Sequence, residues 1–223
     1  MTEKTTRDQI VQAADQLFYR RGYEHTSFAD IAEAVGISRG NFYYHFRSKD
    51  EILDAVIEAR LDQTQNMLDR WELAGKDPAE RIRSFINILI ANRSKIKRYG
   101  CPVGTLCGEL GKLNLAARDD ANQLFTLFRS WLKKQFTLLG RTADADALAM
   151  HLLARSQGVA SLASAFQDEA FIEAEVTQMY GWLEAQVGTR LRPTRGARAK
   201  RSATPKSPSP ARPTTRARTQ RAT

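Results

Sequence analysis

The stretch from Thr26 to Leu53, TSFADIAEAVGISRGNFYYHFRSKDEIL, predicts two short helices joined by a tight turn. Ala32 is small where two crossing helices would approach closely, and Gly36 supplies a glycine for the turn four residues later. Phe42 then provides an apolar anchor for the second helix. The other large apolar residues of the pattern are Ile31, Val35, Ile37 and Phe46. The pattern is typical of a helix-turn-helix, although an ordinary helical hairpin has similar spacing.

The outward face of the second short helix favours DNA over a plain hairpin. It carries polar donors, two phenols and no acidic side chain: Ser38, Arg39, Gly40, Asn41, Tyr43, Tyr44 and His45. Such a face can hydrogen-bond base edges and phosphates. Thr26, Ser27 and Lys49 stand at helix N-termini, where N–H groups and the helix dipole favour a phosphate. An ordinary solvated hairpin would include Asp and Glu on this face.

The same stretch closely resembles the N-terminal domain of TetR-family repressors, over about residues 5–55. The likeness includes the aromatic-His-Phe ending at residues 43–46 and the Ser-Lys-Asp-Glu-Ile-Leu entry to the next helix at residues 48–53. It implies an Ω-shaped homodimer on a palindromic operator in double-stranded DNA, released when the C-terminal domain binds an inducer. The family's DNA-contacting positions fall on Thr26, Ser27, Arg39, Gly40, Asn41, Tyr43, Tyr44, His45 and Lys49.

The chemistry of these side chains divides their expected roles. Arg39 and Asn41 can make bidentate contacts to guanine and adenine, so we expect them to read bases. Tyr43, His45 and Lys49 are expected to hold phosphates and so to fix the register on DNA.

Outside this stretch, apolar spacing predicts helices and no strand before the tail. The expected helices cover about 6–21, 27–35, 38–45, a long one from 48, one from 78, one around 106–110, and 118–139, 144–166 and 169–187. The fold class is therefore all-α, with about nine helices. We expect a helix-turn-helix domain over 1–50, a helical ligand-binding and dimerisation domain over 51–188, and a disordered basic tail over 189–223.

The net charge of +9 belongs to the tail. From Gly188 onward the chain has 11 of its 34 Lys and Arg residues and none of its 25 Asp and Glu residues, so the preceding part is close to neutral. Five of the seven prolines also lie there, and such a composition favours disorder. An alternative function, a general nucleic-acid-binding or architectural protein, rests on this tail. A solubilising extension explains the tail equally well.

The C-terminal half predicts regulation less specifically. The resemblance indicates that the last two helices form the homodimer interface, although apolar stripes of this kind are more often core. A pocket for a small-molecule or electrophile inducer is expected among Phe85, Leu89, Cys101, Leu106, Leu110, Phe125, Phe128, Trp131 and His151. No cofactor or metal is expected, because the three histidines have no ligand spacing.

Cys101 has two interpretations. The segment from Tyr99 to Leu106 resembles the glycine-cysteine turn of a TetR subgroup that includes repressors responding to electrophiles and oxidants, which implies a sensor thiol. A following helix N-terminus and the preceding Lys95, Lys97 and Arg98 would stabilise a thiolate. A small buried cysteine is the other interpretation.

Other classes are less favoured. The chain has no nucleophile elbow, phosphate loop or metal cluster, so we expect no enzyme. A Cys101-dependent enzyme using His151 as base is the remaining catalytic alternative. Two cysteines and no long apolar run indicate a cytoplasmic protein without membrane contact. The family resemblance implies a bacterial protein that is nucleoid-associated when bound to DNA.

Overall fold

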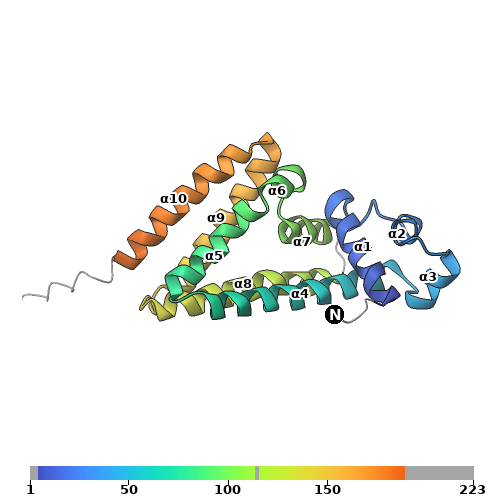
Figure 1. The fold of residues 1–223 in the computed structure, drawn as a ribbon, viewed down its shortest axis with the longest axis horizontal. Helices are drawn as coiled ribbons and strands as arrows, with labels where there is room; N and C mark the ends of the chain where they lie inside the picture. Colours follow the sequence, from blue (N-terminus) through green and yellow to red (C-terminus); the bar gives the residue numbers. More distant parts are fainter. Residues whose placement is uncertain (1–4, 114–115, 189–223) are drawn as a thin grey trace, which may run out of the picture. The chain divides into compact units, whose positions relative to one another are not determined.

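The computed structural model describes residues 5–113 and 116–188 of the chain (Figure 1). Every regular element in these residues is a helix, which confirms the all-α fold class. The helices are α1 (Thr6–Arg21), α2 (Phe28–Val35), α3 (Arg39–His45), α4 (Lys49–Ala74), α5 (Pro78–Ala91), α6 (Arg93–Tyr99), α7 (Pro102–Leu113), α8 (Arg118–Leu138), α9 (Ala145–Phe166) and α10 (Glu169–Gly188). The tail expected to be disordered, 189–223, lies outside the described residues.

Two details of the helices differ from the expectations. The helix expected from residue 78 is divided into α5 and α6 at Asn92, whose backbone leaves helical values (φ −114°, ψ 11°). Its side-chain amide donates to the carbonyl oxygen of Ile88, an alternative to continued helical bonding that Asn offers readily. The spacing of Ser48 and Glu51 at the start of α4 predicts a capping box. Ser48 does accept from the N–H of Glu51, but the Glu51 carboxylate accepts from the N–H of Arg47 rather than from that of Ser48.

Local caps fix the helix-turn-helix. Ser27 and Ser38 cap α2 and α3, each accepting from a backbone N–H three residues on. Gly36 ends α2 in the left-handed conformation (φ +74°), and its N–H bonds to carbonyls of the last turn. Phe42 is 1% exposed and anchors α3 on α2. The two serine caps, the Gly36 turn and the Phe42 anchor therefore produce the helix-turn-helix that the sequence predicts.

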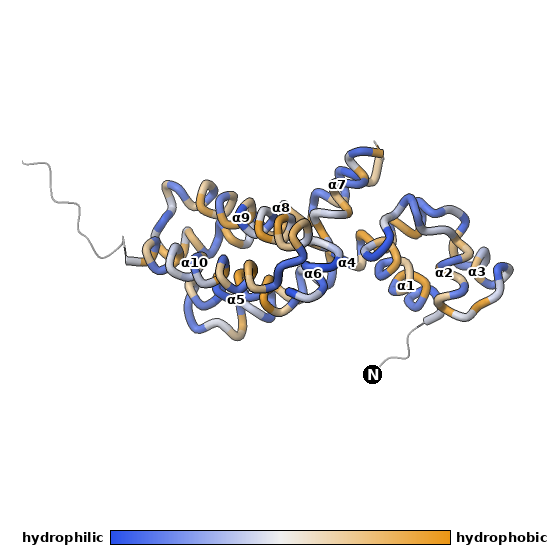
Figure 2. Tube along the Cα trace, turned by 90° about the horizontal axis from the view of Figure 1, so that it is seen from above, coloured by the Kyte–Doolittle hydropathy of each residue, from blue (hydrophilic) through white to orange (hydrophobic). Residues whose placement is uncertain are grey.

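Two clusters of buried side chains hold the described part of the chain together. One joins α1, α2, α3 and the start of α4, and α7 completes it with Leu106, Cys107 and Leu110. The other joins the remainder of α4 to α5, α6, α8, α9 and α10. Hydrophobic and hydrophilic residues alternate along the helices, as expected when one side of each helix is buried (Figure 2). No helix among the described residues is long and apolar enough to cross a membrane.

Candidate DNA-contacting surface and effector cavity

Helix α3 presents a row of exposed residues on its outer face. Arg39, Gly40 and Asn41 are exposed, Tyr43 is 54% exposed and Tyr44 is 85% exposed. The side chains of Arg39, Asn41, Tyr43 and Tyr44 make no hydrogen bond to other described residues. Large aromatic side chains are seldom left in water without a partner, so this surface has the character of a contact site.

Aromatic packing holds this surface in place. The Phe28 ring of α2 lies 5.2 Å from the Phe42 ring and 5.7 Å from the Tyr43 ring, both edge to face. Tyr43 therefore packs one side of its ring on α2 while its hydroxyl remains available. His45, at the end of α3, is half-buried and its ring lies 5.2 Å from that of Tyr44.

Thr26 does not reach this surface. Its side chain is buried (1% exposed), and its hydroxyl donates to the carbonyl oxygen of Gly22 at 2.8 Å. The hydroxyl of Thr26 therefore has a partner within the protein, and a phosphate contact at Thr26 stays a prediction. Ser27 is exposed, but its N–H and hydroxyl both donate to the carboxylate of Asp30. The hydrogen bonds from Ser27 lower the pKa of Asp30, so this carboxylate stays charged at the N-terminus of α2.

Lys49 also has a role other than the expected one. Its ammonium donates to the carbonyl oxygens of Tyr23 (2.8 Å), Thr26 (3.1 Å) and Glu24 (3.4 Å), and it lies 4.2 Å from the centre of the Tyr23 ring. An ammonium group has three donors, so these bonds use its donor capacity. The structure thus makes Lys49 a support for the loop between α1 and α2, and a phosphate would have to compete for it.

Glu109 of α7 holds the same loop from the other side. Its two carboxylate oxygens accept from the backbone N–H groups of Tyr23 and Glu24, each at 2.9 Å. Gly22 permits this approach, because it has a φ of +90° and a Cβ there would lie 2.9 Å from a Glu109 oxygen. This contact could not be predicted from the sequence, since 86 positions separate Glu109 from Tyr23 and no local pattern links them. We call the loop 22–26 with Lys49 and Glu109 the loop clamp.

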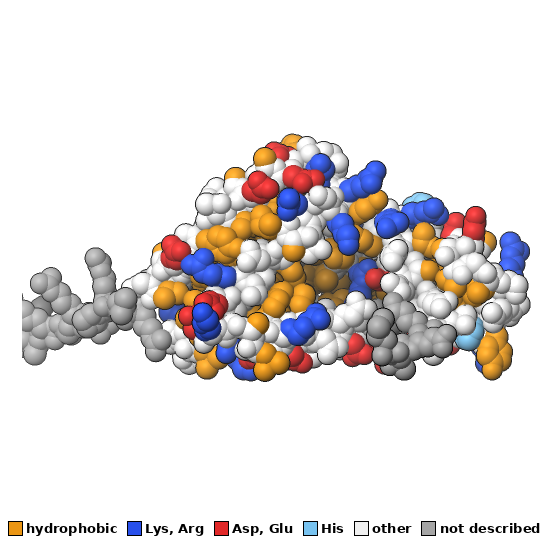
Figure 3. Space-filling view, viewed as in Figure 1, with side chains coloured by type: hydrophobic (Ala, Val, Ile, Leu, Met, Phe, Trp, Pro, Cys, Tyr) orange, Lys and Arg blue, Asp and Glu red, His pale blue; other side chains and the backbone are white. Residues whose placement is uncertain are grey.

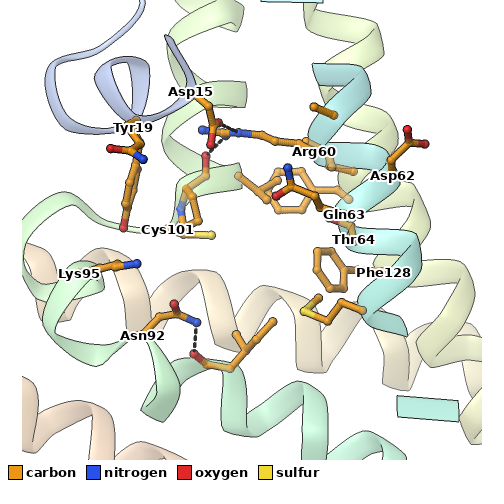
Figure 4. Close-up of a pocket in the computed structure, with 18 of the residues that line it drawn as sticks. Asp15, Tyr19, Arg60, Asp62, Gln63, Thr64, Asn92, Lys95, Cys101 and Phe128 are labelled. Carbon is orange, nitrogen blue, oxygen red and sulfur yellow. Dashed lines mark hydrogen bonds and ion pairs between the residues drawn. The ribbon is translucent and has the colours of Figure 1, made fainter. Parts of the chain in front are cut away.

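The first turn of α7 is tied to α1 and α4 as well. The Tyr19 hydroxyl donates to the carbonyl oxygen of Gly100, just before α7, at 2.8 Å. Arg60, whose contacts are dashed in Figure 4, donates to the carbonyl oxygen of Pro102 at 2.6 Å. Arg60 is 9% exposed and also forms an ion pair with Asp15 of α1. Burial raises the pKa of Tyr19 to about 12, so its hydroxyl stays protonated and able to donate. Helix α7 therefore contacts the N-terminal helices through both of its ends.

A cavity of about 1270 Å³ lies beside this turn, bounded by α1 and by α4 to α9. Hydrophobic side chains form the floor of the hollow seen in Figure 3, and basic side chains stand around it. The expected pocket residues that line it are Phe85, Leu89, Cys101, Phe125 and Phe128. The polar lining that the sequence analysis missed includes Tyr19, Arg60, Gln63, Thr64, Asn92, Lys95 and Gln157.

Four of the expected pocket residues lie elsewhere. Leu106 and Leu110 are buried in the cluster around α1. Trp131 packs against Trp71, with ring centres 5.7 Å apart, and His151 stacks on the Trp182 ring at 4.9 Å. The apolar spacing of these four residues predicts a buried helix face. It does not distinguish a face that packs in the core from one that lines a cavity, so their assignment to the pocket was wrong.

The two cysteines occupy different environments. Cys101 is half-buried on the cavity wall, and its sulfur accepts from the N–H of Gly104 at 3.5 Å. Cys107 is buried, and burial raises the pKa of its thiol to about 11. His151 stacks on Trp182 rather than lining the wall with Cys101, so the geometry does not favour the catalytic alternative. The described residues contain no group of three His, Cys, Asp or Glu side chains that could hold a metal ion.

Comparison with known proteins agrees with this geometry. Residues 10–56 match the family model described as bacterial regulatory proteins, tetR family. The chain is 30% identical over 175 residues to an uncharacterized HTH-type transcriptional regulator in the lacX 3' region of Lactococcus lactis subsp. lactis, covering 77% of this chain and 89% of that protein. The chain belongs to the TetR family of transcriptional regulators.

Other family members match in part or in fold. The regulator TtgR of Pseudomonas putida is 45% identical over 65 residues, which cover 29% of this chain and 30% of that protein. The crystal structure of a TetR regulator from Legionella pneumophila superposes with a TM-score of 0.72 at 26% identity, covering 83% of this chain and 98% of that chain. These relatives are named as transcriptional regulators rather than as enzymes or architectural proteins, so a DNA-binding regulator is the function class of this TetR-family chain.

Proposed function

We propose that this TetR-family regulator is a repressor that binds a palindromic operator through α3 and leaves it when a small molecule occupies the cavity. The observation that carries the proposal is the exposed and unpartnered face of α3, with Tyr44 85% exposed. Arg39 and Asn41 lie in the exposed first turn of α3, where they would read base edges. Tyr43 and His45 would hold phosphates.

Gly40 supports close approach to the groove. A Cβ at this position would meet no protein atom within 4 Å, so the protein's own packing does not require a glycine there. A side chain at position 40 would instead project between α3 and the DNA. We therefore assign Gly40 to the DNA-contacting set, together with Ser27 at its exposed helix N-terminus.

The proposed domain arrangement follows the roles of the helices. The helix-turn-helix domain would cover residues 1–50 and the regulatory domain 51–188. The dimer would form through α9 and α10, and on α9 the side chains of Met150, Leu162 and Phe166 are exposed by 40%, 46% and 74%. Gly158 of α9 and Gly181 of α10 are exposed and have open space beside them, which allows helices of a second copy to approach closely. Two copies of α3 would then meet half-sites about one DNA turn, or roughly 34–36 Å, apart.

The interface can be tested with a matched pair of variants. Leu162→Glu places a charge in the proposed interface and should give monomers by analytical ultracentrifugation. Leu138→Glu, at a comparably exposed position (51%) on α8, should leave the dimer unchanged. A dimer that survived Leu162→Glu would argue against an interface through α9 and α10.

Selection of bound sequences from random DNA tests the DNA-contacting set. The wild type should enrich a palindrome with two half-sites. Arg39→Ala should lose preference at one base position in each half-site and cost about 1–3 kcal/mol of binding free energy. Arg47→Ala, outside α3 but equally basic and exposed, is the control for lost charge and should keep the base preferences. If Arg39→Ala kept every base preference, the assignment of Arg39 would be wrong.

Cys101 offers a second route to release, by reaction with an electrophile. Its place on the cavity wall supports this role, because a molecule that enters the cavity meets the thiol. N-ethylmaleimide should release the wild type and the Cys107→Ser variant from the operator, but not the Cys101→Ser variant. Equal release of Cys101→Ser would contradict the sensor role.

A further inference from the structure

The chemistry of the cavity wall indicates what kind of molecule it takes. One side is apolar and aromatic: Met67, Phe85, Ile88, Leu89, Phe125 and Phe128. Phe85 and Phe128 meet edge to face with ring centres 5.6 Å apart, so they present a fixed aromatic surface. The volume of about 1270 Å³ exceeds the roughly 300–1,000 Å³ of ordinary ligand pockets. A molecule with several rings would fit, and its burial against this wall would supply most of the affinity.

Lys95 of α6 is the distinctive polar group of the wall. Figure 4 shows its side chain directed into the cavity, between Tyr19 and Asn92. It makes no hydrogen bond or ion pair with the other described residues. The neighbouring cations on α6 are engaged elsewhere: Lys97 lies 3.0 Å from a Glu169 oxygen, and Arg93 lies 3.6 Å from carboxylates of α10.

No acidic group of the lining forms an ion pair with Lys95. Asp15 is paired with Arg60, and Asp8 caps the first turn of α1. Glu58 and Asp62 belong to α4, and Figure 4 shows the Asp62 side chain directed away from the cavity. The basic groups Arg7, Arg20 and Arg70 add further positive charge to the lining. An uncompensated ammonium beside an aromatic wall is a combination that suits an aromatic anion.

We propose that the effector is an aromatic or polycyclic molecule that carries a carboxylate or a similar anionic group, with its rings against Phe85 and Phe128 and its anion at Lys95. The amide oxygen of Asn92 is an acceptor, so it does not bind the anion. The amide nitrogen of Asn92 donates to the carbonyl oxygen of Ile88, and this bond orients the Asn92 side chain beside Lys95. This inference rests on the proposed effector role of the cavity and adds the class of ligand and its charge.

Three pyrene probes of similar size test the inference with the full-length protein. Pyrene-1-carboxylate is the anion, pyrene-1-carboxamide is its neutral analogue and pyrenylmethylammonium is the cation. Binding is followed by pyrene fluorescence and by calorimetry, and operator release is followed separately by fluorescence anisotropy of labelled DNA. The wild type should bind the carboxylate about five- to tenfold more tightly than the amide, and the cation most weakly.

Charge variants on one helix identify the responsible group. Lys95→Gln should lower the carboxylate affinity to that of the amide and leave the amide affinity unchanged, whereas Lys95→Arg should keep the preference. Lys97→Gln is the matched control, because it removes the same charge from the same helix at a position paired with Glu169 outside the cavity lining. It should bind all three probes as the wild type does.

The possible outcomes separate this inference from the proposed function. If the three probes bind alike, or if Lys95→Gln keeps the preference, the anionic class is wrong, while operator release by any probe would still support the effector role. If the carboxylate binds through Lys95 without releasing the operator, the ligand class stands and the effector role fails. Absence of binding by every probe would overturn the ligand class.

Discussion

Replacement of Glu109 by Gln tests whether α7 controls the DNA-binding helices through the loop clamp. The carboxylate accepts two N–H groups at 2.9 Å from the loop between α1 and α2. A Gln amide offers one oxygen, and its NH₂ group would face the second N–H, so one donor would lose its partner. A hydrogen bond to a charged acceptor contributes about 1.5–3 kcal/mol. Because Glu109 is only half-buried, solvent screens this bond, and we expect Glu109→Gln to lower the free energy of unfolding by about 1–2 kcal/mol.

This magnitude sets what the assays should detect. For a domain of this size, about 1–2 kcal/mol lowers the melting temperature by roughly 2–8 °C. The looser loop should also lower operator affinity, since α2 begins directly after it and α3 packs on α2 through Phe28 and Phe42. The main readout is the ratio of operator affinity with and without effector, which should move towards one, because α7 links the cavity to the loop. Anisotropy of labelled operator, measured at several effector concentrations, gives this ratio.

The control is Glu24→Gln, which removes the same charge from the loop itself but leaves the backbone N–H at position 24 bonded to Glu109. It should match the wild type in melting temperature and in effector response. A Glu109→Gln protein with wild-type melting temperature, operator affinity and effector response would refute the reasoning that α7 acts through the loop clamp.

Three further predictions concern the backbone and the buried hydroxyl and thiol groups. Gly22→Ala should destabilise the protein more than Gly36→Ala in thermal melts. Gly36 is left-handed (φ 74°, ψ 33°), where Ala loses about 1 kcal/mol to strain. Gly22 (φ 90°, ψ 157°) lies in a region that only glycine adopts readily, and a new Cβ there would also collide with the Glu109 carboxylate; equal losses would contradict this. Because burial raises the pKa of Tyr19 from 10.0 to about 12, its protonated form contributes stability that is complete below about pH 10 and is lost as the pH rises through 12. Tyr19→Phe should flatten the stability profile over that range, measured by chemical unfolding, and an unchanged profile would refute the linkage. Cys107, with its pKa raised to about 11 by burial, should resist iodoacetamide at pH 8 until denaturant is added, as followed by mass spectrometry; rapid labelling of the native protein would contradict its burial.

Local chemistry accounts for what the sequence could predict of the fold. Each cap that the structure contains at Ser27, Ser38 and Asp77 lies within four residues of the N–H group it satisfies, so it is visible in a short window of sequence. The division at Asn92 was missed because the apolar spacing continues on both sides of it. Only the side-chain bond back to Ile88 distinguishes this Asn from one on an unbroken helix.

The cavity could be predicted only in part, because helical spacing identifies a buried face and not what lies against it. Phe128 and Trp131 are three residues apart on one face of α8 and are almost equally buried. Phe128 borders the cavity, whereas Trp131 is covered by Trp71. The difference depends on the positions of other helices. Lys95 was noted for a thiolate at Cys101, but its direction into the cavity depends on the rotation of α6, which no local pattern sets.

The contacts of one residue, Tyr23, show how the regulatory helices could influence DNA binding. Its N–H is held by Glu109 of α7, its carbonyl oxygen by Lys49 of α4, and its hydroxyl by Asp50. These bonds fix the peptide groups immediately before the cap of α2, and α2 in turn positions α3 through Phe28 and Phe42. A movement of α7 would therefore have to break the bond to Glu109 or displace the loop that Lys49 also holds. Lys49 lies at the position where the family likeness implies a phosphate contact, so a phosphate that attracts its ammonium would weaken the same loop clamp. We infer that DNA binding and effector binding act on one loop from opposite sides, DNA through Lys49 and the effector through Glu109 of α7.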